Sequence, residues 1–359
     1  MNYRLAKILA PEDIGGAGTK VIDINIADII SRIDIIFRTK NGDAAFDDHA
    51  AANISKIELV DGSDVLFSLS GREVQALNFY DRKMAADNHL VAQTATWMRA
   101  SFGIDFGRHL YDPELAFDPT KFTNPQLKIT WDENVANTNC ADNYLTIQAH
   151  LFDELTPSPT GFLMSKQVYS YTPEANAYEY ITLPTDYPFR RILFGSHQEY
   201  RTFTQMIAEV KLSEDNDKRI PFDMTGDELL WESKRTCPEY IETVYCLIMD
   251  TDTNFRVTPS EDAIIVGMNT GALQDLFIVF HNGGLVLAKT ETSGETVYMI
   301  CKGYIPHGLV SVPFGNPATP ADWYDVTKIG DLRLRIKAGA DLSTAPTAQV
   351  ITQQQRSYA

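Results

Sequence analysis

The sequence predicts an all-β protein built as two consecutive sandwich domains, each of the size of one jelly roll. Three observations lead to this prediction. Short strand-like runs occupy much of the 359 residues, helical periodicity is confined to two short pieces, and the second half of the chain repeats a pattern of the first. Short apolar strands separated by turn residues favour a β-sandwich over a mixed α/β fold.

Each predicted strand is rich in Ile, Val, Thr and aromatic residues and ends near Gly, Pro, Asn or Asp. Helical periodicity, with Leu, Val and Tyr three or four residues apart, is limited to 71–83 and 226–234. In chain order, the predicted strands span 21–26, 31–39, 54–60, 127–131, 144–151, 178–183, 191–195, 206–212, 240–249, 263–267, 276–280, 297–302 and 332–337.

An internal duplication is the most informative feature. Residues 54–59 (ISKIEL) and 207–212 (IAEVKL) alternate in the same way, and an acidic turn, an apolar position and a helix start follow each of them. Further pairs keep the same order: 32–35 with 191–194, 127–129 with 332–334, and 146–148 with 348–350. Matches that recur in one order indicate that a single structural unit occurs twice.

Both copies start their helix with the same capping pattern. Ser70 and Thr225 can accept hydrogen bonds from N–H groups of the first turn, and Glu73 and Glu228 follow three residues later, which completes a capping box. The second copy carries roughly 50 additional residues between Trp231 and Tyr324, which we expect to form loops or extra strands.

The predicted boundary between the copies follows the strand at 144–151. Pro157 and Pro159 remove backbone donors there and favour extended, solvated chain. We therefore expect an N-terminal segment, a first jelly roll, a linker, a second jelly roll with larger loop insertions, and a last strand with a C-terminal segment, at 1–20, 21–152, 153–161, 162–337 and 338–359 respectively.

The composition argues against several classes of protein. The chain has 31 Lys and Arg against 48 Asp and Glu, a formal charge of −17 that repels nucleic acid and anionic lipid. No apolar run approaches the ~18–20 residues of a membrane helix, and no secretory signal is evident. We expect a soluble protein made in the cytoplasm. Its scattered cysteines are expected to be free thiols: Cys140, Cys237, Cys246 and Cys301.

Patterns for metal binding are weak. The 7 histidines show no H-x-H or H-x-x-x-H spacing of the kind that a cupin-type site would need. Asp250, Asp252, Asn254 and Glu261 match positions 1, 3, 5 and 12 of a calcium-binding loop, but Phe255 occupies the position where the sharp turn requires glycine. We favour an acidic hairpin loop and keep calcium binding as an alternative.

Patterns for catalysis are also weak. The chain has no G-x-S-x-G sequence, and no cysteine lies close to a histidine along the chain. With 48 acidic residues, a pair of carboxylates has little diagnostic value for glycoside hydrolysis. The sequence therefore predicts no catalytic, cofactor-binding or metal-ligating residue, no cofactor, and a protein that is not an enzyme.

Three segments carry a resemblance to a known family: 57–66 (IELVDGSDVL), 180–192 (YITLPTDYPFRRI) and 210–222 (VKLSEDNDKRIPF). With the duplication around them, they resemble the double jelly-roll major capsid proteins of tailless icosahedral viruses, especially bacteriophages with an internal membrane, in the capsid lineage related to adenovirus. The resemblance extends over about 21–353 and depends on architecture and loose strand patterns, not on an invariant motif.

The resemblance implies two tandem eight-stranded jelly rolls, and a homotrimer whose six rolls form a pseudo-hexagonal capsomer in the virion shell. It also implies contacts with neighbouring capsomers, with penton and minor capsid proteins and with internal membrane proteins. The terminal segments 1–20 and 338–359 would be placed to reach such partners, and the extra residues of the second copy would build a tower. Family members supply no catalytic residues, and the membrane between coat and genome is compatible with an acidic chain.

Two alternatives come from other functional classes. A glycan-active enzyme, such as a peptide N-glycanase-like amidase or a glycosidase, would need a cleft with convergent carboxylates and aromatic platforms from Trp131, Trp231 or Trp323. A trimeric viral spike or receptor-binding protein would form trimers without forming a lattice.

Overall fold

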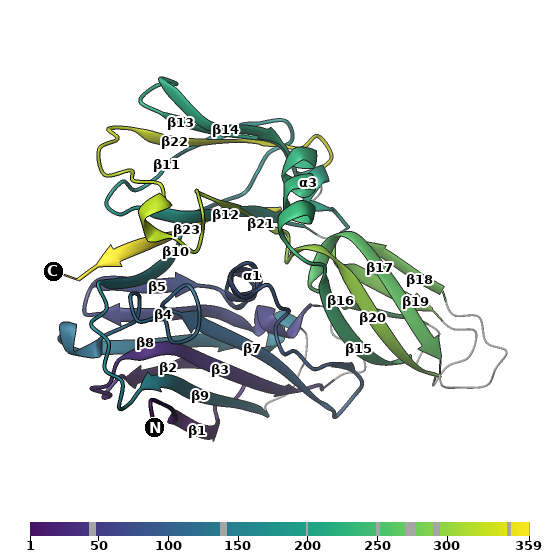
Figure 1. The fold of residues 1–359 in the computed structure, drawn as a ribbon. Coiled ribbons are helices and arrows are strands. Elements are labelled where there is room, and N and C mark those ends of the chain that lie inside the picture. The colour runs from purple at the N-terminus through teal and green to yellow at the C-terminus, as the bar shows by residue number, and fades with distance from the viewer. Residues whose placement is uncertain are drawn as a thin grey trace.

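Two β-sandwiches lie one above the other, and a smaller β-rich unit projects beside them (Figure 1). The computed structural model describes residues 1–42, 48–136, 142–198, 200–248, 252–269, 278–289, 295–342 and 346–358. None of the helices in these ranges is long and apolar enough to cross a bilayer.

The first roll pairs its strands in two sheets, β1-β9-β3-β7 and β2-β8-β4-β5. Alternate residues of its central strands point into the sandwich, which matches the period-2 apolar pattern of the sequence. Its elements are β1 (Tyr3–Asp13), β2 (Ala17–Asp23), β3 (Ile30–Lys40), η1 (Ala50–Asn53), β4 (Ile54–Asp61), β5 (Asp64–Leu69), α1 (Gly71–Arg82), β6 (Leu90–Ala92), β7 (Trp97–Asp105), η2 (Pro119–Lys121), β8 (Pro125–Asp132), η3 (Glu133–Ala136) and β9 (Asn143–Phe152).

The second roll has the sheets β10-β23-β12-β21 and β11-β22-β13-β14. In chain order, β1 to β5 of the first roll correspond to β10 to β14 of the second, and β7, β8 and β9 correspond to β21, β22 and β23. This replacement turns the two strand orders of the first roll into the two strand orders of the second. The rolls therefore share one topology. The elements are β10 (Gly161–Tyr171), β11 (Tyr178–Thr182), β12 (Phe189–His197), α2 (Phe203–Met206), β13 (Ile207–Glu214), β14 (Arg219–Thr225), α3 (Gly226–Thr236), β21 (Leu309–Pro313), η4 (Pro320–Asp322), β22 (Leu332–Ala338) and β23 (Thr347–Ser357).

The segments matched in the sequence occupy equivalent strands: β4 and β13, β3 and β12, β8 and β22, and β9 and β23. Both predicted capping boxes are confirmed. The side chain of Ser70 accepts from the N–H of Glu73, and Thr225 accepts from the N–H of Glu228, while each glutamate accepts from the backbone N–H of its capping residue. Both helices therefore begin for the same reason, which is a capping box at their first turn.

A glycine opens both helices because the chain leaves no room for a side chain there. A Cβ on Gly71 would lie 2.3 Å from the carbonyl oxygen of Ala51, and a Cβ on Gly226 would lie 2.2 Å from that of Ile207. In each copy the helix start therefore packs directly on backbone near the start of β4 or β13.

The extra residues of the second copy form strands between α3 and β21. They build the sheet β17-β20-β15-β6 and the small sheet β16-β19-β18, and β6 of the first roll joins through a parallel pair, Leu90 with Val244. We call residues 240–306 the insertion. Its strands are β15 (Tyr240–Ile248), β16 (Asp252–Arg256), β17 (Pro259–Asn269), β18 (Ile278–Asn282), β19 (Leu285–Lys289) and β20 (Glu295–Pro306).

The structure differs from the expected boundary at the N-terminal end of the chain. Residues 1–20, expected to lie outside the first roll, supply β1 and part of β2, which pair with β9 and β8. Strand β1 is an edge strand with largely exposed or half-buried residues and contains Pro11, so it lacks a clear apolar alternation. Near the C-terminus, β23 lies between β10 and β12 in the interior of a sheet.

Most core residues fall into two clusters. One fills the second roll, and the other fills the first roll and continues into the insertion and the facing side of the second roll. Leu193 and Ile351 belong to the cluster that fills the first roll, while their neighbours Ile192 and Val350 belong to the cluster that fills the second roll. The sheet β10-β23-β12-β21 is therefore covered on both faces, which explains why β12 is buried along almost its whole length.

We predict that Ser70→Ala and Thr225→Ala each lower the free energy of unfolding by about 1 kcal/mol, because each removes one capping interaction. Gly71→Ala should cost more, since its Cβ meets backbone that cannot move away easily. Denaturant unfolding at fixed protein concentration measures these losses. Ser55→Ala, on an exposed serine of β4, is the control, and equal losses for all four variants would contradict the assignment.

Candidate functional site

The two rolls are joined through one shared β-sheet. Strand β5 of the first roll pairs in parallel with β10 of the second, with Phe67 opposite Ser165 and Ser68 opposite Lys166. This pair joins one sheet from each roll into a continuous eight-stranded sheet, β2-β8-β4-β5-β10-β23-β12-β21. The two rolls are thereby held in one fixed relative orientation.

A buried ion-pair cluster lies beside this shared sheet. The side chain of Asp81, at the end of α1, is 4% exposed and accepts from Arg190 Nη1 at 2.6 Å. Arg191 Nη2 is 3.1 Å from the same carboxylate oxygen, and Gln353 Nε2 donates to the other at 2.9 Å. Burial raises the pKa of Asp81, but Arg190 and Arg191 outweigh it and hold the pKa below the ordinary 3.8. A carboxylate of the first roll thus forms ion pairs with two arginines of the second.

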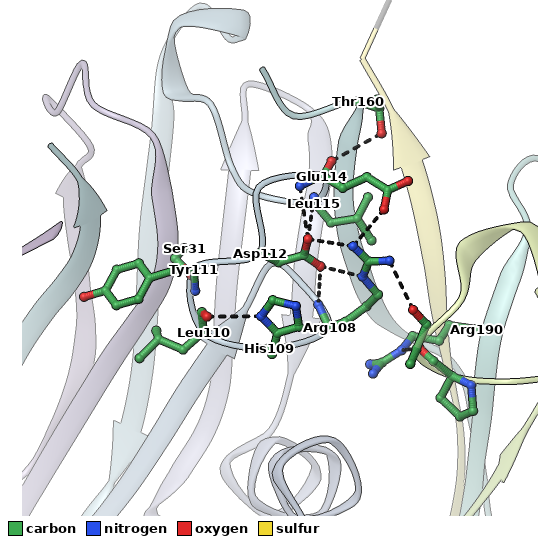
Figure 2. A network of polar contacts seen from close by, with 12 residues as sticks. Ser31, Arg108, His109, Leu110, Tyr111, Asp112, Glu114, Leu115, Thr160 and Arg190 are labelled. Carbon is green, nitrogen blue, oxygen red and sulfur yellow. Dashed lines mark hydrogen bonds and ion pairs between the residues drawn. The ribbon is translucent and has the colours of Figure 1, made fainter. Parts of the chain in front are cut away.

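A second polar network connects loops of the two rolls (Figure 2). Arg108 forms a bidentate pair with the fully buried Asp112, through Nε at 2.6 Å and Nη2 at 2.7 Å, and its Nη2 also contacts Glu114 at 2.7 Å. The remaining Nη1 donates to the carbonyl of Ala318 in the second roll at 3.1 Å. This guanidinium fixes the shape of its own loop and holds the neighbouring roll.

The C-terminal residues return to the first roll. Arg356 pairs with Asp64 at the start of β5. The hydroxyl of Tyr358 donates to the carbonyl of Ala116 at 2.7 Å and accepts from the N–H of Asp118 at 2.7 Å. Arg356 and Tyr358 therefore connect the second roll to the first roll of the same chain.

Histidines that are far apart in the sequence meet under the insertion. The rings of His49 and His307 lie 5.0 Å apart, and His197 lies near enough to His307 to influence its pKa. The N–H of Ala51 donates to His49 Nδ1, which leaves Nε2 to donate toward Glu242 Oε2 at 3.3 Å. Burial, followed by Arg72, lowers the pKa of His197 from 6.5 to about 3, and His307 is also shifted well below 6.5 by its burial.

The structure describes only part of the candidate calcium loop. Asp250 lies outside the described residues, Asp252 and Asn254 lie on β16, and Glu261 accepts instead from the N–H of Thr204 at 2.7 Å. In the described ranges, no group of three or more His, Cys, Asp or Glu is placed to hold a metal ion. Cys237, Cys246 and Cys301 are free thiols, and Cys140 lies outside the described residues.

The three tryptophans of the glycan-binding alternative lie in different environments. Trp131 and Trp323 are buried, each within a different hydrophobic cluster, whereas Trp231 is 60% exposed on α3. They do not form a common aromatic platform.

The junction residues Asp81, Arg108, Arg190 and Arg191 were absent from the sequence predictions. The only local signal for the arginines is the run 189–195, in which two adjacent arginines interrupt an otherwise apolar strand. Adjacent residues of a regular strand point to opposite faces of the sheet. Both arginines nevertheless contact Asp81, at a place where the pairing of β12 with β23 shifts register between Phe189 and Arg191.

Comparison with solved structures identifies the architecture. The major capsid protein P2 of bacteriophage PM2 superposes with a TM-score of 0.58 over 99% of this chain and 98% of that chain, at 10% sequence identity. The fold is the double jelly roll. The major capsid protein of Sulfolobus turreted icosahedral virus gives 0.60 at 11% identity, over 98% and 96% of the two chains. Vp54 of PBCV-1 gives 0.56 at 10% identity, over 99% and 94%.

No family model and no curated protein sequence matches the chain. The likeness of this double jelly roll to the three capsid proteins is therefore structural. It extends over 94% or more of each chain.

We predict that Asp81→Asn lowers the free energy of unfolding by about 3–5 kcal/mol, because it leaves two buried arginines without their counter-charge. Asp64→Asn, which removes the partly exposed pair with Arg356, should cost only ~0–1 kcal/mol. Denaturant unfolding of both variants measures the difference. Since the pKa of Asp81 is depressed in the fold, its contribution is complete above pH 3.8 and declines as the pH falls below that value.

A second prediction concerns His197. Because the folded state resists protonating this histidine, stability should fall as the pH drops below 6.5, by up to about 1.4 kcal/mol per pH unit for this group. Burial raises the pKa of Glu73 to about 7, which acts in the opposite direction, so the test compares two proteins. His197→Gln should lose less stability than the original chain between pH 6.5 and pH 4.5; parallel curves would refute the assignment.

Proposed function

We propose that the protein is a major capsid protein that trimerises into pseudo-hexagonal capsomers of an icosahedral virus shell. The observation that carries this proposal is the pairing of two rolls of identical strand order in one shared sheet. Three such chains around a threefold axis present six similar sandwiches, which approximate a hexagon and can pack as a closed lattice.

The full-length likeness to three major capsid proteins supports the same proposal. The polar side chains of the junction also suit a structural role. Asp81, Arg108, Arg190 and Asp112 are used in contacts within and between the rolls. On this proposal the chain is a structural protein of the virion and not an enzyme.

A surface on the insertion fits a contact between copies of the chain. Strands β15, β17 and β20 present an exposed apolar face that includes Ile241, Ile264, Val266, Tyr298 and Ile300. A recess of about 390 Å³ lies on this face. Since chains of net charge −17 repel one another, a stable trimer requires apolar burial of this kind.

Other partners follow from the proposed role. Beyond its own copies and neighbouring capsomers, the shell subunit would contact penton and minor capsid proteins, and internal membrane proteins if the virus has an inner vesicle. The chain would be synthesised in the host cytoplasm and incorporated into the virion. The acidic composition argues against direct sequence-specific binding of nucleic acid.

We predict that the purified chain forms trimers at micromolar concentration, since obligate interfaces bury about 2,000 Å² or more and leave little free monomer. Mass determination by light scattering should give three times 40.2 kDa. Electron microscopy of concentrated protein should show pseudo-hexagonal particles and their arrays. A clean monomer would reject the capsid proposal, and trimers that never form arrays would favour the spike alternative.

The exposed face of the insertion supplies a sharper test. Val266 and Ile300 are 61% and 50% exposed, so the double variant Val266→Lys, Ile300→Lys should fold normally and yet fail to trimerise. Val21→Lys, on an exposed valine of β2, is the matched control. Light scattering reports the mass and circular dichroism reports the fold. A trimer that tolerates both lysines would exclude this face as the subunit contact.

A further inference from the structure

A small polar cavity lies where the first roll, the second roll and the insertion meet. Its volume is about 20 Å³. All three units contribute to its lining, with Arg72 from α1 of the first roll, Gln198 from the end of β12, and Arg256 and Gly283 from the insertion. A Cβ on Gly283 would lie 2.1 Å from the carbonyl oxygen of Arg201, so the turn of the insertion packs directly against the second roll.

One lining side chain is buried without using its polar atoms. Gln198 is only 4% exposed, and neither Nε2 nor Oε1 has a hydrogen-bond partner in the described part of the chain. Buried amides are nearly always satisfied by protein, water or an ion. The unsatisfied amide of Gln198 in the lining therefore points to an occupant.

The charge of the lining indicates which kind of occupant fits. Among the described residues of the lining, Arg72, Arg201 and Arg256 supply three guanidinium groups and Asp48 supplies one carboxylate, which pairs with both Arg72 and Arg256. In a chain of net charge −17, this is a locally cationic place. A cation would be repelled here, and a neutral water molecule would gain less than an anion from the guanidinium groups.

The size of the cavity restricts the anion. A water molecule requires about 10–15 Å³ measured in this way, so 20 Å³ admits one particle of similar or slightly larger radius. A tetrahedral oxyanion such as phosphate has four oxygens around its centre and exceeds this space.

We propose that the cavity binds one halide ion, with donors from Gln198 Nε2 and the guanidinium groups of Arg72 and Arg256. The Oε1 atom of Gln198 is a hydrogen-bond acceptor, so it would not contact the anion. It is suited to accept a hydrogen bond from a guanidinium N–H. Because the three units each contribute to the lining, the ion stabilises the docking of the insertion on the two rolls. This inference is independent of the proposed capsid function.

Bromide is the probe, because its anomalous X-ray scattering locates the ion in a crystal and distinguishes it from water. Crystals of the full chain grown or soaked in sodium bromide should show an anomalous peak in this cavity. In solution, bromide and chloride should raise the midpoint of thermal unfolding relative to gluconate at equal ionic strength. The rise should grow with the logarithm of the halide concentration, reaching about 4 °C near one hundred times the dissociation constant.

Gln198→Leu should abolish the difference between halide and gluconate, whereas Gln126→Leu, on β8 of the first roll, should retain it. Density for a water molecule without anomalous signal would overturn the proposal. It would also be overturned if halide and gluconate gave the same midpoint, or if their difference persisted in Gln198→Leu. The crystallographic test uses the original chain, so it decides the question even if the leucine variant does not fold.

Discussion

Coverage of one sheet on both faces is the constraint on which the rest of the structure depends. The sheet β10-β23-β12-β21 belongs to the second roll, yet its outer face packs against α1 and the core of the first. Charged groups on this sheet cannot reach water freely. Arg190 and Arg191 consequently need the carboxylate of Asp81. The buried ion pairs follow from the way the rolls share a sheet.

Much of the fold could be predicted from sequence because it depends on local signals. Period-2 alternation located the central strands of both rolls, and the Ser/Thr-Gly-x-Glu pattern located both helices, since capping is a contact between neighbours in the chain. Strand β1 was missed because an edge strand that is half exposed carries little alternation. Strand β7 was missed because small residues such as Ala100 and Gly103 dilute its pattern.

The functional features were harder to predict because they arise between distant segments. Nothing near Asp81 in the sequence indicates Arg190, and His49 gives no indication of His197 or His307. Such contacts depend on the relative placement of whole sheets, which a single sequence does not encode locally. At about 10% identity to the capsid proteins, the fold is retained while most of the particular side chains are not.

The pairing of β6 with β15 has a consequence for the order in which the chain is made. The core of the first roll includes Tyr240, Val244, Phe255 and Val286, all supplied by the insertion. A nascent chain that has just left the ribosome with the first roll complete still lacks these residues and exposes the apolar surface they cover. Synthesis of this protein therefore passes through a stage prone to aggregation, at which helper chaperones have the most to protect.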